Sequence, residues 1–357
     1  MVSVGAGPAG LAAAVEAARN GVQVAVFDEN DRPGGQLFKQ IHKFFGSREH
    51  YARERGFRIG QRFLEEADKL GVEVSLSSTV LGIYENGAMN VMKGDRIEQV
   101  KAERILVATG ASENMIPFPG WTLPGVIGAG AAQTMANIHG IRPGENLLMV
   151  GSGNVGVVVA YQMLQAGCRV AAVIDAAPRI GGYGVHAAKV ARYGVPFRMS
   201  HTIKAVRGTE RVEGATIVQV DDRWQPVPGT EQDVDVDTVC LAVGLNPMAQ
   251  LLQMSGCQTA FVAKLGGRVP VHDENQETTV PGVFVAGDVS GIEEASTAII
   301  EGRIAGLAVA RSLGYLDERA FLEQRDQQIE SMTGLRSGTH GDARRVAKEY
   351  LNALMKG

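Results

Sequence analysis

The spacing of apolar residues changes twice within the first thirty positions, and these changes predict a strand, a helix and a second strand. Apolar residues at 2–4 lead into a glycine-rich segment, 5–10, after which an alanine-rich helix is expected as far as about Asn20. Residues 22–27 are again mainly apolar, and this run ends at Asp28. Short apolar runs beside turn residues are typical of buried strands, whereas the longer alanine-rich segment favours a helix. The sequence therefore predicts a strand–helix–strand unit at the start of the chain.

The turn of this unit has the spacing GxGxxG, which suits a dinucleotide. Gly5 allows a tight turn, Gly7 lets the backbone approach a pyrophosphate, and Gly10 lets the helix lie close to the strand. The first N–H groups of the helix then face the phosphates. A carboxylate at the end of the second strand is placed to accept hydroxyls of an adenosine ribose. We expect this site to include Gly5, Gly7, Pro8, Ala9, Gly10, Asp28 and Glu29.

The same order of elements returns after residue 145. A strand at 146–150 leads into a second GxGxxG at 151–156, a helix to Gln165, and a strand at 169–174 that ends at Asp175. This carboxylate favours NAD(H), because it would repel the extra phosphate of NADP(H). The acid stands one residue further from its first glycine than in the first unit, so a scaffold module that binds no nicotinamide is an open alternative. The expected site residues are Gly151, Gly153, Asn154, Val155, Gly156 and Asp175.

Three further motifs accompany the first unit. A Gly-Gly pair stands at 34–35, a buried strand closes on Ala-Thr-Gly at 108–110, and an apolar strand closes on Gly-Asp at 287–288. In this order, and together with the opening loop, they resemble the FAD and pyridine-nucleotide oxidoreductases shaped like thioredoxin reductase. The resemblance covers almost the whole chain and implies FAD in the first unit.

The resemblance assigns a role to each motif. The Gly-Gly pair would bring backbone amides to the second phosphate, and Asp288 would accept a hydrogen bond from a ribityl hydroxyl. A helix that begins near 294–296 would direct its positive end to the flavin pyrimidine carbonyl, and Val80 would pair its backbone with an adenine edge. The residues expected to contact FAD in this way are Gly34, Gly35, Gln36, Val80, Ala108, Thr109, Gly110, Gly287, Asp288, Glu294 and Ala295.

A narrower resemblance concerns the nucleotide-binding α subunits of flavin amine dehydrogenases. It depends on ATGA at 108–111, PFPGW at 117–121, LPGV at 123–126 and GAGAAQ at 128–133. The resemblance implies a chain that handles electrons while a separate flavin subunit oxidises the amine. Those α subunits often carry a cysteine-rich segment for an iron–sulfur centre, and this sequence has none near its end.

The segment 36–58 is rich in aromatic and cationic residues, and a helix is expected at 37–45. In the disulfide reductases that this layout resembles, cysteines stand two and seven positions after the second glycine, where this chain has Leu37 and His42. A flavin could therefore not pass electrons to a dithiol there. His42 and Lys43 are the candidate catalytic residues, because either could stabilise negative charge on a reduced ring. A solvated surface or a docking face is the alternative for this segment.

The composition limits the classes of binding partner that we expect for this protein. The 35 basic and 39 acidic residues give a net charge of −4, which argues against nucleic acid. There is neither a membrane-length apolar run nor a signal peptide before the first glycine, so we expect a cytoplasmic protein. The three cysteines stand far apart and predict neither a disulfide framework nor a metal site.

Together these features predict an α/β fold with two Rossmann-like, three-layer dinucleotide-binding domains and small antiparallel meanders. The FAD domain would be discontinuous, at 1–115 and 235–316, with the NAD(P) domain inserted at 116–234. A polar tail, 317–357, would hold a loop at 336–341 and an amphipathic helix at 342–355, either as a surface strap or as a partner-binding helix.

The preferred function is hydride transfer between NAD(H) and FAD, with electrons passed on to a partner subunit or another acceptor. A small-molecule substrate, an amine or amino acid, follows from the resemblance, and a homo-oligomer is a further possibility for the assembly. The alternatives are a non-catalytic scaffold that bound nucleotide stabilises, and a disulfide-reductase-like enzyme that uses a partner's dithiol.

Overall fold

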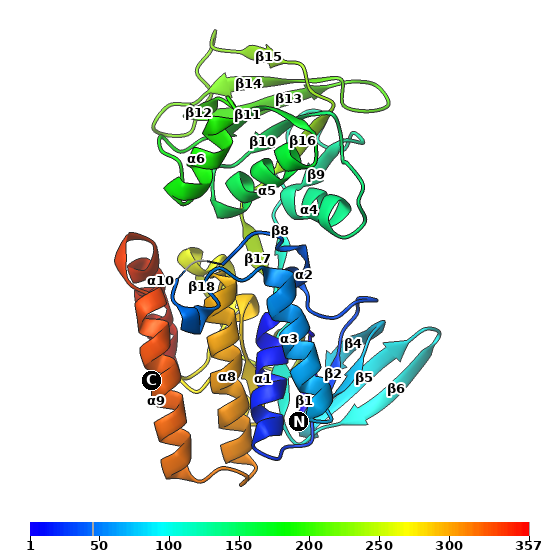
Figure 1. The fold of residues 1–357 in the computed structure, drawn as a ribbon, viewed down its shortest axis with the longest axis vertical. Helices are drawn as coiled ribbons and strands as arrows, with labels where there is room; N and C mark the ends of the chain where they lie inside the picture. Colours follow the sequence, from blue (N-terminus) through cyan, green and yellow to red (C-terminus); the bar gives the residue numbers. More distant parts are fainter. Residues whose placement is uncertain (45, 357) are drawn as a thin grey trace. The chain divides into compact units, whose positions relative to one another are not determined.

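The computed structural model describes residues 1–44 and 46–356, and it leaves the side chains of residues 339 and 340 undescribed. The chain forms two compact units (Figure 1). The first contains residues 1–112 and the chain from 246 onward, and the second contains residues 113–245. Both combine a parallel sheet with helices, which confirms the expected α/β class with small antiparallel sheets.

The first unit is built on a five-stranded parallel sheet. Its strands read VSV, AVF, ILV and VFV at four of the five positions, and nearly all of these residues are buried. Such mainly apolar runs are expected where both faces of a parallel sheet are covered. The strand order is β20 (Val283–Val285), β7 (Ile105–Val107), β1 (Val2–Val4), β2 (Ala25–Phe27) and β3 (Glu73–Ser75).

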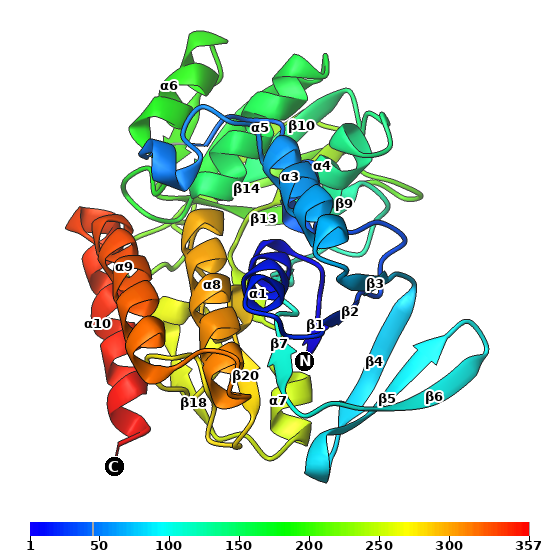
Figure 2. The same cartoon turned by 60° about the horizontal axis from the view of Figure 1, so that its bottom comes forward.

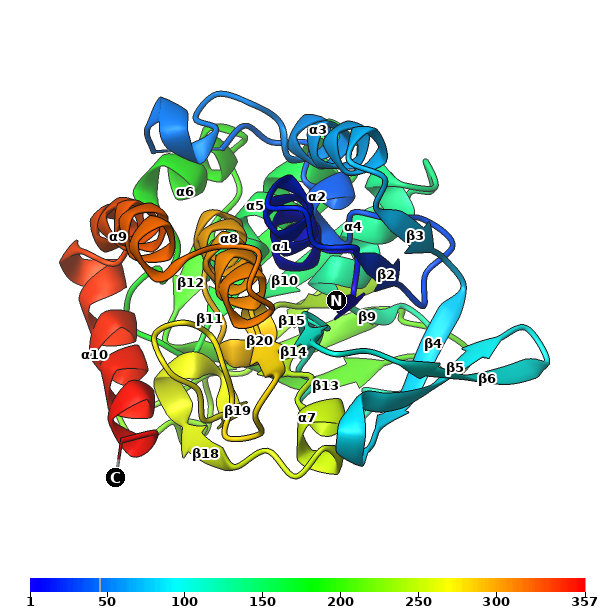
Figure 3. The same ribbon diagram turned by 90° about the horizontal axis from the view of Figure 1, so that it is seen from below.

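Three long helices pack side by side on this sheet, as Figures 2 and 3 show. They are α1 (Pro8–Arg19), α3 (Gly56–Lys69) and α8 (Ala295–Ser312). The contact between α1 and α8 is close because two glycines of α8 face the backbone of α1: a Cβ atom at Gly302 would lie 2.2 Å from the Ala9 carbonyl oxygen, and one at Gly306 would lie 2.6 Å from that of Ala13.

Smaller elements complete the first unit. The antiparallel sheet of β4 (Ser78–Ile83), β5 (Ala88–Lys93) and β6 (Arg96–Lys101) follows the expected meander. The strand pair β18 (Thr259–Val262) and β19 (Gly267–Pro270), with α7 (Gln250–Met254), lies later in the chain. The connecting strands β8 (Ala111–Glu113) and β17 (Leu245–Pro247) pair with each other where the chain leaves the first unit and returns.

The tail is more ordered than expected. It forms two helices, α9 (Glu318–Leu335) and α10 (Gly338–Leu354), and α9 packs on α8 (Figure 3). The sequence pattern did not indicate α9, and the loop expected at 336–341 is wrong because α10 already begins at Gly338. The helix α9 is polar along most of its length and buries few side chains, among them Phe321 and Met332, so its apolar spacing is weak.

The second unit repeats the sheet of the first. Its five strands are all parallel, with a buried apolar β10 at the centre. Helices α4 (Ala129–Asn137), α5 (Asn154–Gln165) and α6 (Gly184–Arg192) accompany it, with an antiparallel sheet of β13 (His201–Arg207), β14 (Gly214–Gln219) and β15 (Gln232–Val234). The order of the main sheet is β9 (Val126–Gly128), β16 (Thr238–Leu241), β10 (Asn146–Val150), β11 (Arg169–Asp175) and β12 (Phe197–Met199).

Three expectations need correction. The chain returns to the first unit at Asn246 and not at 235, because β16 pairs with β10 and β9 of the second unit. The helix expected at 37–45 is only α2 (Gln36–Lys39), and Phe45 lies outside the described residues. The strand expected at 22–27 is limited to Ala25–Phe27. Among the helices described, none has the length and apolar character needed to cross a membrane.

Candidate dinucleotide sites

The three glycines of the first loop have different reasons to be glycine. Gly5 has φ +105°, and a Cβ atom there would lie 2.4 Å from the Ala108 carbonyl oxygen. A Cβ atom at Gly10 would lie 2.0 Å from the Gly5 carbonyl oxygen. Gly7, in contrast, has an ordinary φ of −77°, and its Cβ would meet nothing within 4 Å. The fold therefore requires Gly5 and Gly10, whereas Gly7 leaves open space at the start of α1, as a bound pyrophosphate would require.

The second loop repeats this geometry. A Cβ atom at Gly151 (φ +109°) would lie 2.2 Å from the Ala242 carbonyl oxygen, and one at Gly156 would lie 2.1 Å from that of Gly151. Gly153 has φ −64°, and its Cβ would again meet nothing within 4 Å. The second unit thus has the same open space at the start of α5. Of the neighbours in this loop, Val155 is exposed.

The acids at the two strand ends hold the glycine loops. One oxygen of the buried Asp28 accepts the N–H of Ala6 at 2.7 Å, and the other accepts that of Asn30 at 2.9 Å. Asp175 likewise accepts the N–H of Ser152 at 2.7 Å and that of Ala177 at 2.9 Å. A carboxylate has about four acceptor positions, so each acid keeps capacity for a ribose hydroxyl. Contact with a ribose stays a prediction for both acids, and Glu29, beside Asp28, is exposed.

A Gly-Gly pair contacts the glycine loop in both units, although the sequence analysis assigned a phosphate-binding role only to the first pair. Gly34 donates its N–H to Ala6 O at 2.7 Å, and Gly182 donates its N–H to Ser152 O at 2.8 Å. In both units the two glycines stand six and seven residues after the strand-end acid, at 34–35 and at 181–182. An arginine stands two residues before each pair. This internal repeat was the available signal for the second pair.

Ser152 is a residue of the second loop that the sequence reasoning did not single out. Its hydroxyl donates to Asp175 at 2.7 Å and accepts the N–H of Gly181 at 3.1 Å. It therefore joins the glycine loop, the strand-end acid and the second Gly-Gly pair. A serine inside GxGxxG is too common to indicate such a role by itself.

Asp288 is placed to accept a hydroxyl. It follows Gly287, whose φ is +79°, and its side chain is half-buried. Its carboxylate accepts the N–H of Glu293 at 3.3 Å. Burial, reinforced by the neighbouring carboxylates of Glu301, Glu293 and Glu294, raises the pKa of Asp288 to about 7. A hydroxyl donor such as a ribityl group would stabilise this carboxylate in its ionised form, so the residue fits FAD.

The helix expected to face the flavin begins at Ala295, as predicted. Glu294 is its N-cap and makes no side-chain hydrogen bond to the first amides of α8. The positive end of the helix dipole at this point suits a partly negative group. Contact with a flavin ring stays a prediction.

The remaining predicted contacts of the first unit lie on three segments. Val80 is buried on the edge strand β4, which is held near Asp28 by a hydrogen bond from Ser78 N to Asp28 O of 2.9 Å. Thr109 donates its hydroxyl to Met248 O at 2.8 Å, and Gly110 has φ +73° with open space around it. Ala108 is buried after β7, Gln36 stands at the start of α2, and Pro8 and Ala9 open α1.

The candidate catalytic pair is divided between two environments. His42 is half-buried and stacks on Phe44, with ring centroids 6.2 Å apart, whereas Lys43 is exposed and its backbone pairs with Arg55. Leu37 is fully buried in the core, so the position of the missing first cysteine has a packing role. A catalytic role for His42 or Lys43 stays a prediction.

The segment around 36–58 is not simply a solvated surface. His50 Nε2 lies 2.9 Å from the Ser331 hydroxyl of α9, and Arg303 of α8 donates to the Tyr51 hydroxyl at 2.7 Å. These contacts join the segment to the helices of the same unit.

The cysteines do not supply a reactive thiolate. Cys168, Cys240 and Cys257 are all buried and free. Burial raises the pKa of each thiol, to about 12 for Cys240, so all three stay protonated at neutral pH. Within the part of the chain that is described, His, Cys, Asp and Glu side chains form no group of three or more that could hold a metal.

Several known proteins resemble this chain in sequence or fold. An opine oxidase subunit of Rhizobium meliloti is 30% identical over 346 residues, which cover 88% of this chain and 63% of that protein. Hydrogen cyanide synthase subunit HcnB of Pseudomonas aeruginosa is 28% identical, over 98% of this chain and 79% of its own length. The thioredoxin reductase of T. acidophilum has a similar fold, with a TM-score of 0.71, 22% identity, and coverage of 87% of this chain and 97% of its own.

The chain thus spans less than two thirds of the opine oxidase protein that it matches. Residues 1–302 match the model of the family described as pyridine nucleotide-disulphide oxidoreductase. Two open glycine loops, each on a five-stranded parallel sheet, agree with that match. The chain belongs to the pyridine nucleotide-disulphide oxidoreductase family.

Proposed function

We propose that this oxidoreductase moves hydride and electrons between NAD(H), bound by the second unit, and FAD, bound by the first, and passes them to a partner subunit or another acceptor. The observation that carries the proposal is the matched pair of open glycines. Gly7 and Gly153 have φ values that any residue adopts and no neighbour that a Cβ atom would meet. Space for a ligand is therefore the reason for glycine at both positions.

FAD, when bound, would supply the chemistry of hydride acceptance and onward electron transfer. The chain's own residues would bind and orient it. The N–H groups at the start of α1 would hold the pyrophosphate, Asp288 would accept a ribityl hydroxyl, and the first amides of α8 would stabilise negative charge at the far end of the ring.

The electron acceptor lies outside this chain in the proposal. Leu37 and His42 stand where a dithiol would be needed, and the three cysteines are buried with raised thiol pKa values. Two of the relatives are named as subunits of opine oxidase and of hydrogen cyanide synthase. We therefore propose that this chain, too, works within a larger assembly, and that the reductant or substrate of this assembly is an amine or amino acid.

The test compares the wild type with G7A and G153A. Each purified chain that binds FAD is first saturated with it. The visible spectrum is then recorded before and after NADH is added under anaerobic conditions. We expect a yellow wild type that NADH bleaches, a G7A variant whose FAD affinity falls at least tenfold, and a G153A variant that stays yellow with NADH but is bleached by dithionite.

Each alternative has its own outcome in this experiment. A wild type that takes up no FAD would overturn the flavoenzyme proposal. A wild type that holds FAD but is not bleached by NADH would reduce the second module to a scaffold. Far-UV circular dichroism of the apo chains is the control, because neither alanine should disturb the fold.

A further inference from the structure

Four charged side chains are buried together in the first unit. Glu293, Glu301, Arg336 and Lys348 have side chains that are 3–10% exposed. Arg336 donates to Glu293 at 2.6 Å and to Glu301 at 2.5 Å. Lys348 Nζ lies 2.8 Å from the same oxygen of Glu301, Oε1. Two carboxylates and two cations therefore balance one another away from water.

The second oxygen of Glu301 holds the segment that contains Asp288. Glu301 Oε2 accepts the N–H of Gly287 at 2.9 Å and the hydroxyl of Ser290 at 2.9 Å. Lys348 reaches the same segment directly, because its Nζ donates to Ser290 Oγ at 2.6 Å and to Ser290 O at 3.1 Å. The residues on either side of Asp288 are thus fixed by groups that are themselves fixed by the tail.

The partners come from distant parts of the chain. Glu301 lies on α8, whereas Arg336 stands between α9 and α10 and Lys348 lies on α10. The tail is therefore more than the surface strap that was one interpretation of its sequence, and the other, a partner-binding helix, stays a prediction. It reaches the Gly-Asp segment through two buried cations.

Stability alone does not explain this arrangement. Removing charges from water is costly, and apolar side chains of similar volume often replace a buried ion pair without loss of stability. Burial would raise the pKa of Glu301, but Lys348 and Arg336 outweigh that effect and hold it at about 2, so the carboxylate is ionised at neutral pH. An ionised carboxylate is a stronger acceptor for the N–H of Gly287 than a neutral group would be.

We propose that Lys348 and Arg336 are positioning residues for FAD. Through Glu301 and Ser290 they hold the segment 287–290 in the conformation in which Asp288 contacts the ribityl chain. The tail formed by α9 and α10 therefore stabilises the flavin site. This inference rests on the proposed function, in which Gly287 and Asp288 contact FAD.

The test measures FAD affinity in variants that separate position from stability. K348M removes one cation and keeps a side chain of similar length. E301L/K348M replaces the central pair with apolar groups and leaves Arg336 paired with Glu293. We expect each to raise the FAD dissociation constant at least tenfold, while the melting temperature of apo E301L/K348M stays within about 5 °C of the wild type. K348R, which keeps the charge, should recover much of the loss.

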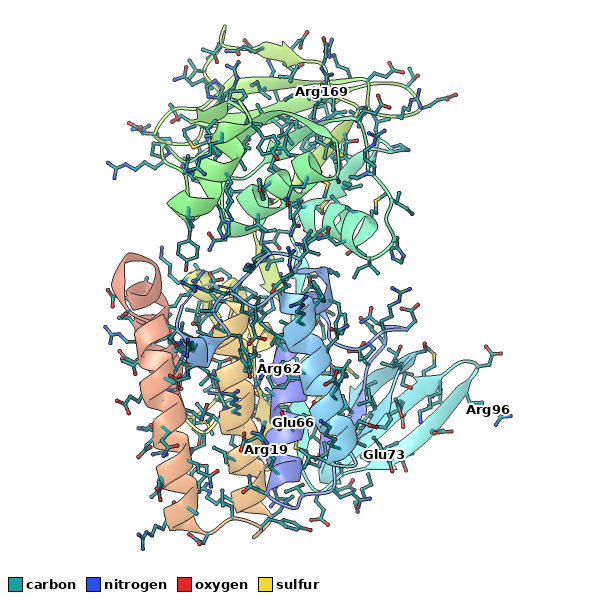
Figure 4. All side chains as sticks on the ribbon, viewed as in Figure 1. Arg19, Arg62, Glu66, Glu73, Arg96 and Arg169 are labelled. Atoms are coloured by element: carbon teal, nitrogen blue, oxygen red, sulfur yellow. The ribbon has the colours of Figure 1, made fainter. Side chains whose placement is uncertain are left out.

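A matched control exists in the same unit. Arg19 of α1 and Glu66 of α3 also form an ion pair between two helices, and Figure 4 shows them directed toward one another, but their side chains are 45% and 39% exposed. R19M/E66L should leave FAD affinity unchanged, because neither residue contacts the segment 287–290.

Two results would overturn the inference. One is FAD affinity of K348M and E301L/K348M within twofold of the wild type, whatever their melting temperatures. The other applies if K348M does not fold: it is an FAD affinity of E301L/K348M equal to that of the wild type. A wild type that binds no FAD would instead overturn the proposed function, so the two failures are distinguishable.

Discussion

The two units share a glycine loop and the order of four strands, but they differ at the fifth, which forms one edge of each sheet. In the first unit β20 is followed by Gly287, Asp288 and the helix α8, and in the second unit β9 occupies the same place in the sheet and is followed by α4. The N-cap side chain of α8 does not bind its first amides. The amides of Gly130 and Ala131 in α4, in contrast, are bound by the carboxylate of Glu113, at 2.6 and 3.2 Å.

This difference separates two kinds of ligand site. In the first unit no N-cap side chain binds the first amides of α1 or α8, and a buried charge network fixes the segment between β20 and α8. In the second unit the chain's own carboxylate binds the first amides of α4, whereas no N-cap side chain binds those of α5. A resident cofactor suits the first arrangement, and a cosubstrate that binds and leaves suits the second.

The largest expected effect comes from the glycines that the fold requires. G5A and G151A place a Cβ atom 2.4 and 2.2 Å from a backbone carbonyl oxygen, at φ values of +105° and +109°. We expect each to cost about 3 kcal/mol of stability, from strain and overpacking. Thermal unfolding of the apo chains measures this.

The same measurement on G7A and G153A supplies the comparison. Their Cβ atoms meet nothing within 4 Å, so we expect changes within about 0.5 kcal/mol. Equal losses for the two kinds of glycine would contradict the division into fold-required and ligand-required positions.

The next effect concerns pH and distinguishes the first site from the second. Asp288 has a pKa of about 7 instead of 3.8, so the folded apo chain binds a proton there that the unfolded chain lacks between these values. Its contribution to stability is therefore present at low pH and is lost as the pH rises toward 7. If a ribityl hydroxyl donates to the ionised carboxylate, FAD affinity should rise by up to about tenfold per pH unit as the pH increases toward 7.

D288N isolates this effect. The buried His272 has its pKa lowered to about 4, and its contribution runs in the opposite direction, because stability is lost as the pH falls below 6.5. Because His272 is present in both chains, its contribution cancels when the pH profile of D288N is subtracted from that of the wild type. FAD affinity of D288N should be independent of pH over this range, and D175N should keep the wild-type profile. A pH-dependent D288N would assign the titration to another group.

The local parts of the fold could be predicted from the sequence, and the contacts between distant segments could not. The GxGxxG loops, their flanking strands and the start of α8 depend on residues that stand close together in the chain, so spacing predicted them. The bond between Asp28 and Ala6 follows only once the two strands are known to be adjacent. Glu301 and Lys348 stand far apart in the chain, and a lysine within a polar helix has no pattern that indicates burial.

The smallest expected effect concerns the start of α4, where the carboxylate of Glu113 binds the first amides of the helix. E113Q keeps the shape of the side chain but loses the charge that faces the first turn of α4. A charge at a helix N-terminus contributes up to about 1 kcal/mol, which corresponds to about a fivefold change in local opening. Hydrogen–deuterium exchange in peptides from α4 should accelerate by up to that factor, with α8 unchanged. Exchange in α4 that is unaffected by E113Q would mean that Glu113 does not close this helix end in solution, and the contrast between the two ligand sites would then rest on the Gly287–Asp288 segment alone.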